Sequence, residues 1–579
     1  MLASYFKAVR QSRTLSLAGD IPLLLQRYII AIMLNACTQW QFLRREDRAM
    51  PLSYIISKTK QKISPRAQYF LYILRLSCTG TIFFTSNMAF NANIAHAQKS
   101  EAAEASPKPQ ISSKPIVNTE IPKKHKRPIA EERLNALFDT ESLSYLLNHN
   151  NTALRRQDIS AGYFVAEQAF GNLAPGLKPW RDRLSEHGFT FELTYKGEGM
   201  ANLSGGLSKG MDYTHEIRAS MLFDLGKLTG WNPLQGWYLH GIVMNREGRQ
   251  VGWDHVGERN VLLTEVWSIH GPAAARLADL YLEKSFLNNR ININVGRISL
   301  THTYSTSILL CTFMTMCSAP MAIREPAGWS VYPKTSWGGT VRFRPTHDLI
   351  LRTGIYRIGP KARDNTGWAW GDEPYTGIQT PIELTWEPFF GTRKLPGHYK
   401  IGFGHDTSPY PDMVGTIPAA FAGSVRPHKL KPRDTFYIEA DQMVYRSHGE
   451  HQMAGGYVLA GFIHNTPSNS TFSNEFYAGA SLLGIIPHRP LDRLGVMYSY
   501  YQLSPRLAYG QRMQEAAGVP LGPYINGPQT HSAILEAYYG IPVTPGLVIT
   551  PEFEYMMRPG ETSVIPNAIL AGLKVIAAL

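Results

Sequence analysis

The sequence has few charged residues and few cysteines, and its early apolar stretch is too interrupted to cross a membrane. Charged residues make up 18% of the 579 positions, compared with about 25% in an ordinary soluble protein. The stretch 22–36 is broken by Gln26 and Arg27, whereas a helix needs about 20 apolar residues to span a bilayer. The composition therefore excludes a polytopic helical membrane protein, a coiled coil and a disordered chain.

Enzyme signatures are also missing. The chain contains no nucleophile elbow, no Walker loop and no Rossmann glycine pattern. His448 and His451 could suggest a metal site, but no third ligand stands nearby. We therefore expect no catalytic residue, no metal and no cofactor, and we predict that the protein is not an enzyme.

The four cysteines fall into two groups. Cys37 and Cys78 precede the expected cleavage point described below, which leaves Cys311 and Cys317 in the mature chain. In an exported protein, two thiols at this spacing form either a disulfide around a small loop or a pair of free thiols. We expect the disulfide.

The net charge of +13 lies entirely in the N-terminal part of the chain. Residues 131–579 contain 39 basic and 39 acidic groups, so the whole excess belongs to 1–130. Because the body of the chain is neutral, we expect no nucleic-acid partner.

Residues 1–97 are interpreted as a targeting region. Over 58–97 a basic stretch, a moderately apolar run and Ala95-His96-Ala97 follow one another, which is the order of a secretory signal peptide cleaved before Gln98. The signal stands unusually far from residue 1. Either its basic region is very long, or the initiator Met is assigned too far upstream, and we favour the second explanation.

Two further segments separate this region from the body. Residues 98–130 are rich in Pro, Lys, Ser, Ala and Glu and are expected to form a disordered linker. Residues 131–175 contain a pattern compatible with a short helix, whose function cannot be read from the sequence.

From Phe189 onward, short segments alternate between apolar and polar residues. In one of them, Val341 and Phe343 share a face while Arg342 and Arg344 share the other. About sixteen or seventeen such segments follow at spacings of roughly 20–25 residues, wider than a soluble sandwich uses. The stretches 301–335, 358–379 and 406–434 are expected to be long loops.

The polar faces of these segments are too ionic to share a dry core. The consistent solution is an all-β fold, a closed antiparallel transmembrane β-barrel with lipid outside and water inside. We predict such a barrel over 176–579, in the cell outer membrane. The charged residues of the polar faces include Arg342, Arg344, Arg352, Glu383, Lys400, Glu439, Asp441, Glu552 and Glu554.

Several motifs in this body resemble the carbohydrate-selective porin (OprB) family. They cover 176–579 and are densest in the first half. They are Trp180-Arg181-Asp182-Arg183-Leu184-Ser185-Glu186-His187-Gly188, Asn202-Leu203-Ser204-Gly205-Gly206, Leu282-Glu283-Lys284-Ser285, Val295-Gly296-Arg297 and Tyr332-Pro333 followed by Trp337-Gly338.

The resemblance implies a porin of sixteen antiparallel strands that passes sugars by passive diffusion, narrowed by a loop folded into the lumen. Two features differ from the family pattern. The chain ends Ala577-Ala578-Leu579 rather than in an aromatic residue, and Ser307–Pro320, where the pore loop is expected, is unusually apolar. The apolar pore-loop segment argues against specificity for glucose.

Candidate residues for selecting a sugar follow from strand parity. Paired ionic groups bind hydroxyls, and aromatic rings stack on pyranose faces. Arg297 shares the parity of apolar neighbours, so it points inward only if Gly296 marks a bulge. Trp329, Tyr332 and Trp337 are either sugar-stacking or interfacial residues. The remaining lumen candidates are Glu192, Glu283, Arg342, Arg344 and Arg352.

The leading hypothesis is therefore an outer-membrane porin for carbohydrates and similar small polar solutes. The alternatives are a barrel enzyme of the lipase or protease type, and a structural barrel tethered to the envelope through 98–130. The sequence leaves open whether the protein is a monomer or a trimer.

Overall fold

The computed structural model describes residues 173–578, apart from 268–274, 288, 308, 318, 325–328, 347, 360–365, 369, 371–375, 394, 417–428, 431, 448–453, 490–491 and 545. The chain divides into two compact units, Met1–Glu120 and Ile121–Leu579, and every described residue belongs to the second. Several expected features lie outside the described residues. They are the signal peptide, the linker, most of 131–175, and His448 and His451. They stay predictions.

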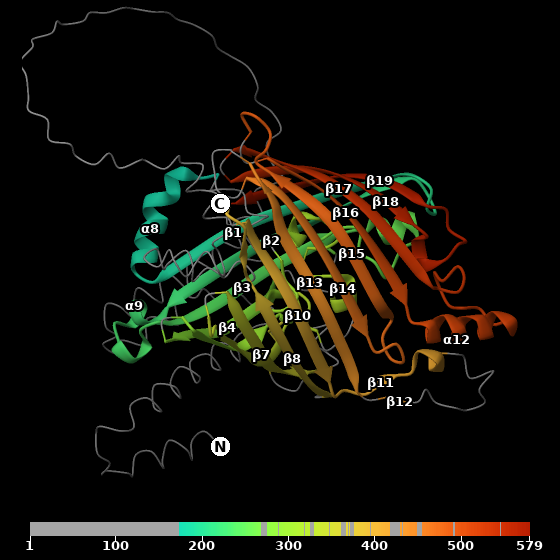
Figure 1. Cartoon of the computed structure of the whole chain (residues 1–579), viewed down its shortest axis with the longest axis horizontal. Coiled ribbons are helices and arrows are strands. Elements are labelled where there is room, and N and C mark those ends of the chain that lie inside the picture. The colour runs from blue at the N-terminus through green and yellow to red at the C-terminus, as the bar shows by residue number, and fades with distance from the viewer. Residues whose placement is uncertain are drawn as a thin grey trace, which may run out of the picture. The chain divides into compact units, whose positions relative to one another are not determined.

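Sixteen strands of the described part form one closed antiparallel barrel, which confirms the predicted fold (Figure 1). Each strand pairs with its successor, and the last pairs with the first, so no edge is left open. The strands are β1 (Phe189–Ser204), β2 (Gly210–Asp224), β3 (Trp237–Gly248), β4 (Arg276–Phe286), β5 (Ile291–Ile298), β6 (Ser336–Phe343), β7 (Leu349–Ile358), β8 (Gly377–Trp386), β10 (Leu395–Asp406), β13 (Arg433–Arg446), β14 (Gly455–Asn465), β15 (Phe472–Leu483), β16 (Arg493–Leu503), β17 (His531–Thr544), β18 (Leu547–Met557) and β19 (Ala568–Ala578).

Short elements decorate the barrel. The two-residue strand β9 (Phe389–Phe390) pairs with β10, and β11 (Tyr410–Pro411) pairs with β12 (Lys429–Leu430). No helix in the described ranges is long and apolar enough to cross a membrane. The helices are α8 (Lys178–Glu186), α9 (Leu225–Thr229), α10 (Met321–Arg324) and α12 (Pro505–Ala516), with single turns at Pro175–Leu177, Asn232–Leu234, Gly252–Val256, Leu300–His302, Leu310–Thr312, Met413–Thr416 and Pro559–Glu561.

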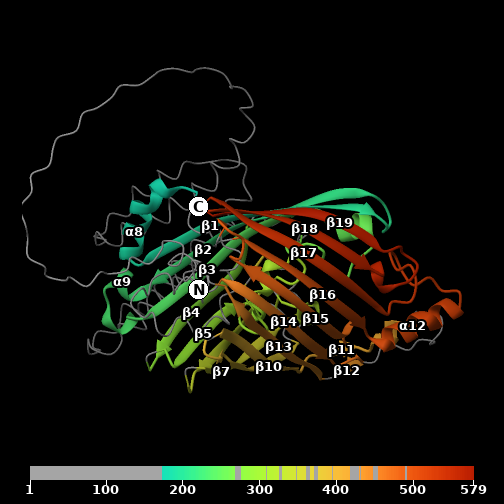
Figure 2. The ribbon, with the colours of Figure 1, turned by 45° about the horizontal axis from the view of Figure 1, so that its top comes forward.

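The two ends of the barrel differ in their connections. Figure 1 places α8 and α9 at one end, the turn end, and α12 at the other, the loop end. The strands run obliquely between these ends, as Figure 2 shows. The expected long loops are confirmed at the loop end, because β5 and β6, β7 and β8, and β10 and β13 are each joined there by a long connection.

The burial of side chains is inverted relative to a soluble protein. On β8, Ile382 and Leu384 are 46% and 39% exposed, whereas Glu383 between them is 1% exposed. The same alternation recurs on β18, where Phe553 is exposed and Glu554 is buried. Apolar side chains therefore face outward and ionic ones inward, which is the pattern that a bilayer requires.

The connection between β5 and β6, residues 299–335, folds into the barrel, and we call it the inner loop. Its apolar side chains, such as Phe313 and Met316, join the largest buried cluster together with Tyr477 and Tyr501 of the barrel wall. The apolar segment Ser307–Pro320 was expected at the pore loop, and it belongs to this inner loop.

The last strand forms despite its lack of a terminal aromatic residue. β19 pairs with both β18 and β1. Leu573 on it is exposed and Lys574 is buried, so the outward period expected from the sequence is kept.

Candidate functional site

The three arginines expected on one wall lie together on the inner face, next to the turn end. Arg342 on β6 stands directly opposite Arg352 on β7. All three are buried. Arg352 Nη1 donates to Glu383 Oε1 (3.0 Å), and Arg344 Nη1 lies 3.4 Å from Glu387 Oε2. The structure thus adds carboxylate partners to the expected cations.

Arg342 has a different kind of partner. Its Nη2 donates to Oδ1 of Asn289 (2.6 Å) in the turn between β4 and β5. The amide oxygen is a neutral acceptor, unlike the carboxylates that face Arg344 and Arg352. The hydrogen bond ties the guanidinium of Arg342 on β6 to the turn between β4 and β5.

The two candidate glutamates also lie on the inner face. Glu283 accepts hydrogen bonds from His240 Nε2 (2.5 Å) and Asn292 Nδ2 (2.8 Å), one from each neighbouring strand. Glu192 on β1 is half-buried and shares its face with Lys196. Their inward orientation agrees with the parity rule, and their part in sugar selection stays a prediction.

Arg297 does not line the lumen. The β4–β5 and β5–β6 ladders run through Gly296 without a change of register, so the required bulge is absent. Arg297 consequently keeps the outward parity of Val295 and is buried against its neighbours. Its guanidinium lies over Trp337, and its Nε is 3.3 Å from Thr335 Oγ1.

The three aromatic candidates lie in two different environments. Trp329 and Tyr332 are 2% and 1% exposed inside the inner loop, which leaves no ring face for a sugar and is also not a membrane-interface position. Tyr332 stacks on His302, with ring centroids 4.5 Å apart. Trp337 lies outside with Val341, so the interfacial alternative fits it better than sugar stacking.

Carboxylates of the barrel wall hold the inner loop in place. Glu383 accepts from the backbone N–H of Ser305 (2.8 Å), and Glu475 accepts from that of Ala322 (2.6 Å). Glu536 accepts from the backbone N–H groups of two loop residues, Met314 and Thr315. Such charge-assisted bonds are stronger than neutral ones, so the wall fixes the path of the loop.

The anchors Glu475 and Glu536 were not singled out from the sequence, although a signal for them exists. Each alternates with an exposed apolar residue, Phe476 and Leu535 respectively. The parity rule that identified Arg342 would have placed both inside the barrel.

The inner loop contains Cys311 and Cys317. Cys311 and Cys317 are joined by a disulfide in the structure and are buried. Arg324 braces this turn by donating to the carbonyl oxygens of Thr315, Cys317 and Ala319. That these two cysteines are oxidised in the mature protein stays a prediction.

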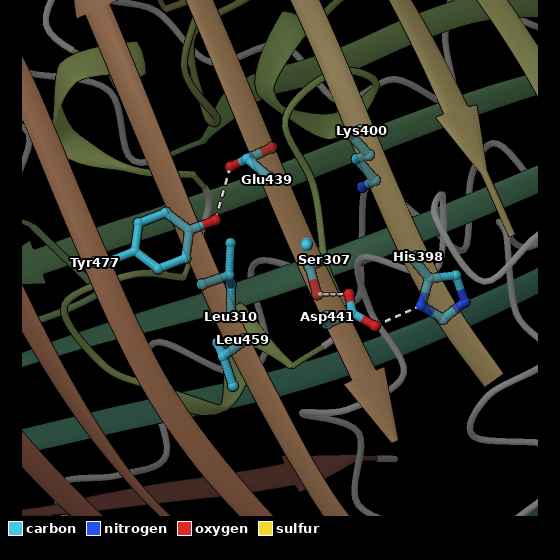
Figure 3. Close-up of a pocket in the computed structure, with 9 residues that line it drawn as sticks. Ser307, Leu310, His398, Lys400, Glu439, Asp441, Leu459 and Tyr477 are labelled. Atoms are coloured by element: carbon cyan, nitrogen blue, oxygen red, sulfur yellow. Dashed lines mark hydrogen bonds and ion pairs between the residues drawn. The ribbon is translucent and has the colours of Figure 1, made fainter. Parts of the chain in front are cut away.

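A recess between the inner loop and the wall brings together ionic and apolar groups (Figure 3). Two cross-strand pairs of β10 and β13 face it, His398 with Asp441 and Lys400 with Glu439. Its complete lining is Ser307, Leu310, His398, Lys400, Glu439, Ala440, Asp441, Leu459 and Tyr477. Within the described ranges, no group of three side chains is arranged to hold a metal.

At the loop end, two buried carboxyls connect two loops. Glu258, after β3, accepts from the backbone N–H of Gly560 (2.9 Å), after β18. Glu561 accepts from Asn260 Nδ2 (2.9 Å) and from Gln529 Nε2 (2.8 Å). Burial raises the pKa of both carboxyls above the usual range, and the proximity of Glu258 raises that of Glu561 further.

This pair predicts that the loop end loosens as the pH rises. A raised pKa means that the packing is favourable at acid pH, where the groups are protonated, and weakens as the pH rises through the raised values. We expect amide exchange in 249–267 and 558–567 to accelerate over that range. Glu561→Gln keeps an oxygen acceptor without the charge, so its exchange should lose most of the added pH dependence. Identical pH profiles of the two proteins would contradict the prediction.

Comparison with known proteins gives one family. The model of the "Carbohydrate-selective porin, OprB family" matches residues 208–578. Porin B of Pseudomonas aeruginosa is 25% identical over 408 residues, covering 68% of this chain and 88% of the relative. Putative porin QuiX of Acinetobacter baylyi is 22% identical over 410 residues, covering 68% and 90%.

A solved structure agrees at the level of the fold. The high-pH structure of Pseudomonas putida OprB superposes with a TM-score of 0.63 at 21% sequence identity, covering 69% of this chain and 97% of that one.

Proposed function

The chain belongs to the carbohydrate-selective porin OprB family, and we propose from this that it lets carbohydrates and similar small polar solutes diffuse passively across the outer membrane. The observation that carries the proposal is the inverted barrel. Its closed wall presents ionic side chains inward and apolar ones outward. A polar lumen lowers the barrier for hydroxyl-rich solutes and excludes apolar ones.

Liposome swelling tests this function. Vesicles containing the purified protein should swell in monosaccharides, more slowly in disaccharides, and not in large oligosaccharides. Swelling that is absent with every sugar, despite a folded barrel, would favour the structural alternative. The family membership favours a channel over an enzyme, and hydrolysis of a lipid or peptide substrate by the purified protein would overturn that preference.

The arginine wall is proposed to set the ion preference of the pore. Replacing Arg342 and Arg344 together by Ala removes two cations and leaves Glu387 without its Arg344 partner. The reversal potential in a salt gradient should shift toward cation selectivity by several millivolts or more, and sugar block should weaken, since wall charges govern the local ion concentration.

Arg393→Ala is the matched control, because this arginine is exposed in the turn between β8 and β10. Its reversal potential should stay close to that of the wild type. An unchanged potential and unchanged sugar block in the double variant would place the arginine wall away from the constriction.

A further inference from the structure

An exposed arginine stands against two aromatic rings at the loop end of the barrel. Arg259 belongs to 249–267, the connection that follows β3, and Tyr524 belongs to 517–530, next to α12 (Figure 1). The guanidinium carbon of Arg259 lies 3.7 Å from the centre of the Tyr524 ring and 5.5 Å from that of the Trp253 ring. Two connections that are far apart in the sequence thus meet in one group of three side chains, which we call the mouth stack.

The mouth stack is accessible to a ligand. Tyr524 is 69% exposed, so most of its ring is open to water. Arg259 is exposed as well, and within the described ranges its guanidinium takes part in no hydrogen bond or ion pair. A guanidinium stacked on a ring keeps its N–H donors at its edge, where they can bind the oxygen atoms of a ligand.

Both connections are fixed by hydrogen bonds near the mouth stack. Glu258 Oε1 accepts from the backbone N–H of Val261 (2.8 Å), and Val261 is buried in the cluster inside the barrel. In the other connection, the backbone N–H of Gln529 donates to Oε1 of Gln511 on α12 (2.7 Å). Tyr524 itself has a φ of 68°, a left-handed conformation that large side chains rarely adopt and that persists where the surrounding structure imposes it.

An aromatic ring beside a guanidinium complements the surface of a sugar. A pyranose has an apolar C–H face, which packs on an aromatic ring, and a rim of hydroxyl oxygens, which accept from N–H donors. The longer loops of an outer-membrane barrel face the outside of the cell. The mouth stack therefore lies on the side from which external solutes enter.

We propose that the mouth stack is a capture site for a free pyranose at the external entrance of the pore. The sugar packs on the open part of the Tyr524 ring, and Arg259 donates to two neighbouring hydroxyl oxygens. The inference rests on the proposed function and adds to it a first binding step outside the lumen. Transient binding beside the entrance raises the local concentration of the sugar, and with it the rate of entry from that side.

The sidedness of sugar block tests the site. Glucose, and in a second series galactose, is added in turn to each side of a planar bilayer, and the association rate of blocking events is measured on single channels. Tyr524→Ala should lower the rate from the loop-end side about two- to tenfold, the usual range for an aromatic contact, and leave the rate from the turn-end side unchanged. Arg259→Lys should have the same one-sided effect, because it keeps the charge and removes the planar donor.

Tyr509→Ala is the matched control, because Tyr509 is another exposed tyrosine at the loop end, on α12. It should keep both rates of the wild type. Unchanged rates in Tyr524→Ala, or an equal loss from both sides, would overturn the capture site while the porin function stands. A wild-type rate in Arg259→Lys would overturn the role of the guanidinium. If neither sugar blocks or passes a conducting channel, the proposed function fails, and the capture site fails with it.

Discussion

Replacing residues 306–324 by a short glycine–serine linker should raise the single-channel conductance severalfold. The described residues of this segment occupy the lumen, where Phe313, Met314 and Met316 are completely buried. A barrel of sixteen strands leaves an aqueous channel when no chain segment fills it. The wall carboxylates that now bind the loop, such as Glu536, would then face water, which solvates them without cost. Planar-bilayer recording in 1 M salt measures the change.

Removal of α12 is the control for shortening a loop of this barrel. This helix lies at the loop end, outside the strands, as Figure 1 shows. Its removal should leave the conductance within the scatter of the wild type. A conductance that is equally unchanged after truncation of the inner loop would mean that solutes follow a path that the loop does not narrow.

Glu383→Leu should destabilise the barrel by about 3–5 kcal/mol, the usual effect of removing one partner from a buried ion pair. Glu383 accepts from Arg352 (3.0 Å), from the Ser305 backbone (2.8 Å) and from the Tyr437 hydroxyl (2.8 Å). The substitution removes one acceptor from each of three buried donors, and one of these donors is charged. The temperature at which the folded band disappears on a heat-modifiability gel, and urea unfolding in detergent, both report the loss.

A double variant separates the ion pair from the other two bonds. Glu383→Leu combined with Arg352→Leu removes both charges of the ion pair and should recover part of the lost stability. Glu247→Ala, at an exposed site on β3, should be close to neutral. If the double variant were no more stable than Glu383→Leu alone, the Arg352 charge would be solvated after the substitution, and the expected cost would be wrong.

The architecture was readable from the chain because strand pleating is local. Successive residues of a strand point to opposite faces. The orientations of Val341, Arg342 and Phe343 can therefore be predicted without knowing which strands lie beside them. The ionic character of one face then demanded a barrel with an aqueous interior. Arg297, one of the lumen candidates, keeps the parity of Val295, because the β4–β5 ladder has no change of register at Gly296.

The lumen itself could not be derived in this way. The bond between Met314 and Glu536 joins residues 222 positions apart, and the one between Ser305 and Glu439 joins residues 134 apart. Neither pairing has a periodic signal. Each pairing depends on how the closed wall and the inner loop fit together. The burial of Trp329 depends on the same fit, so the sequence alone left Trp329 as a candidate for stacking on a sugar.

The sequence by itself therefore determined which side chains face water and which face lipid, because that follows from backbone geometry and solvation within single strands. Only the tertiary structure decided which inward charges pair with an opposite charge, as Arg352 does with Glu383, and which hold the inner loop, as Glu536 does. The physical reason is that an ionic side chain takes the nearest complementary group in three dimensions, and closure of the barrel determines which group that is.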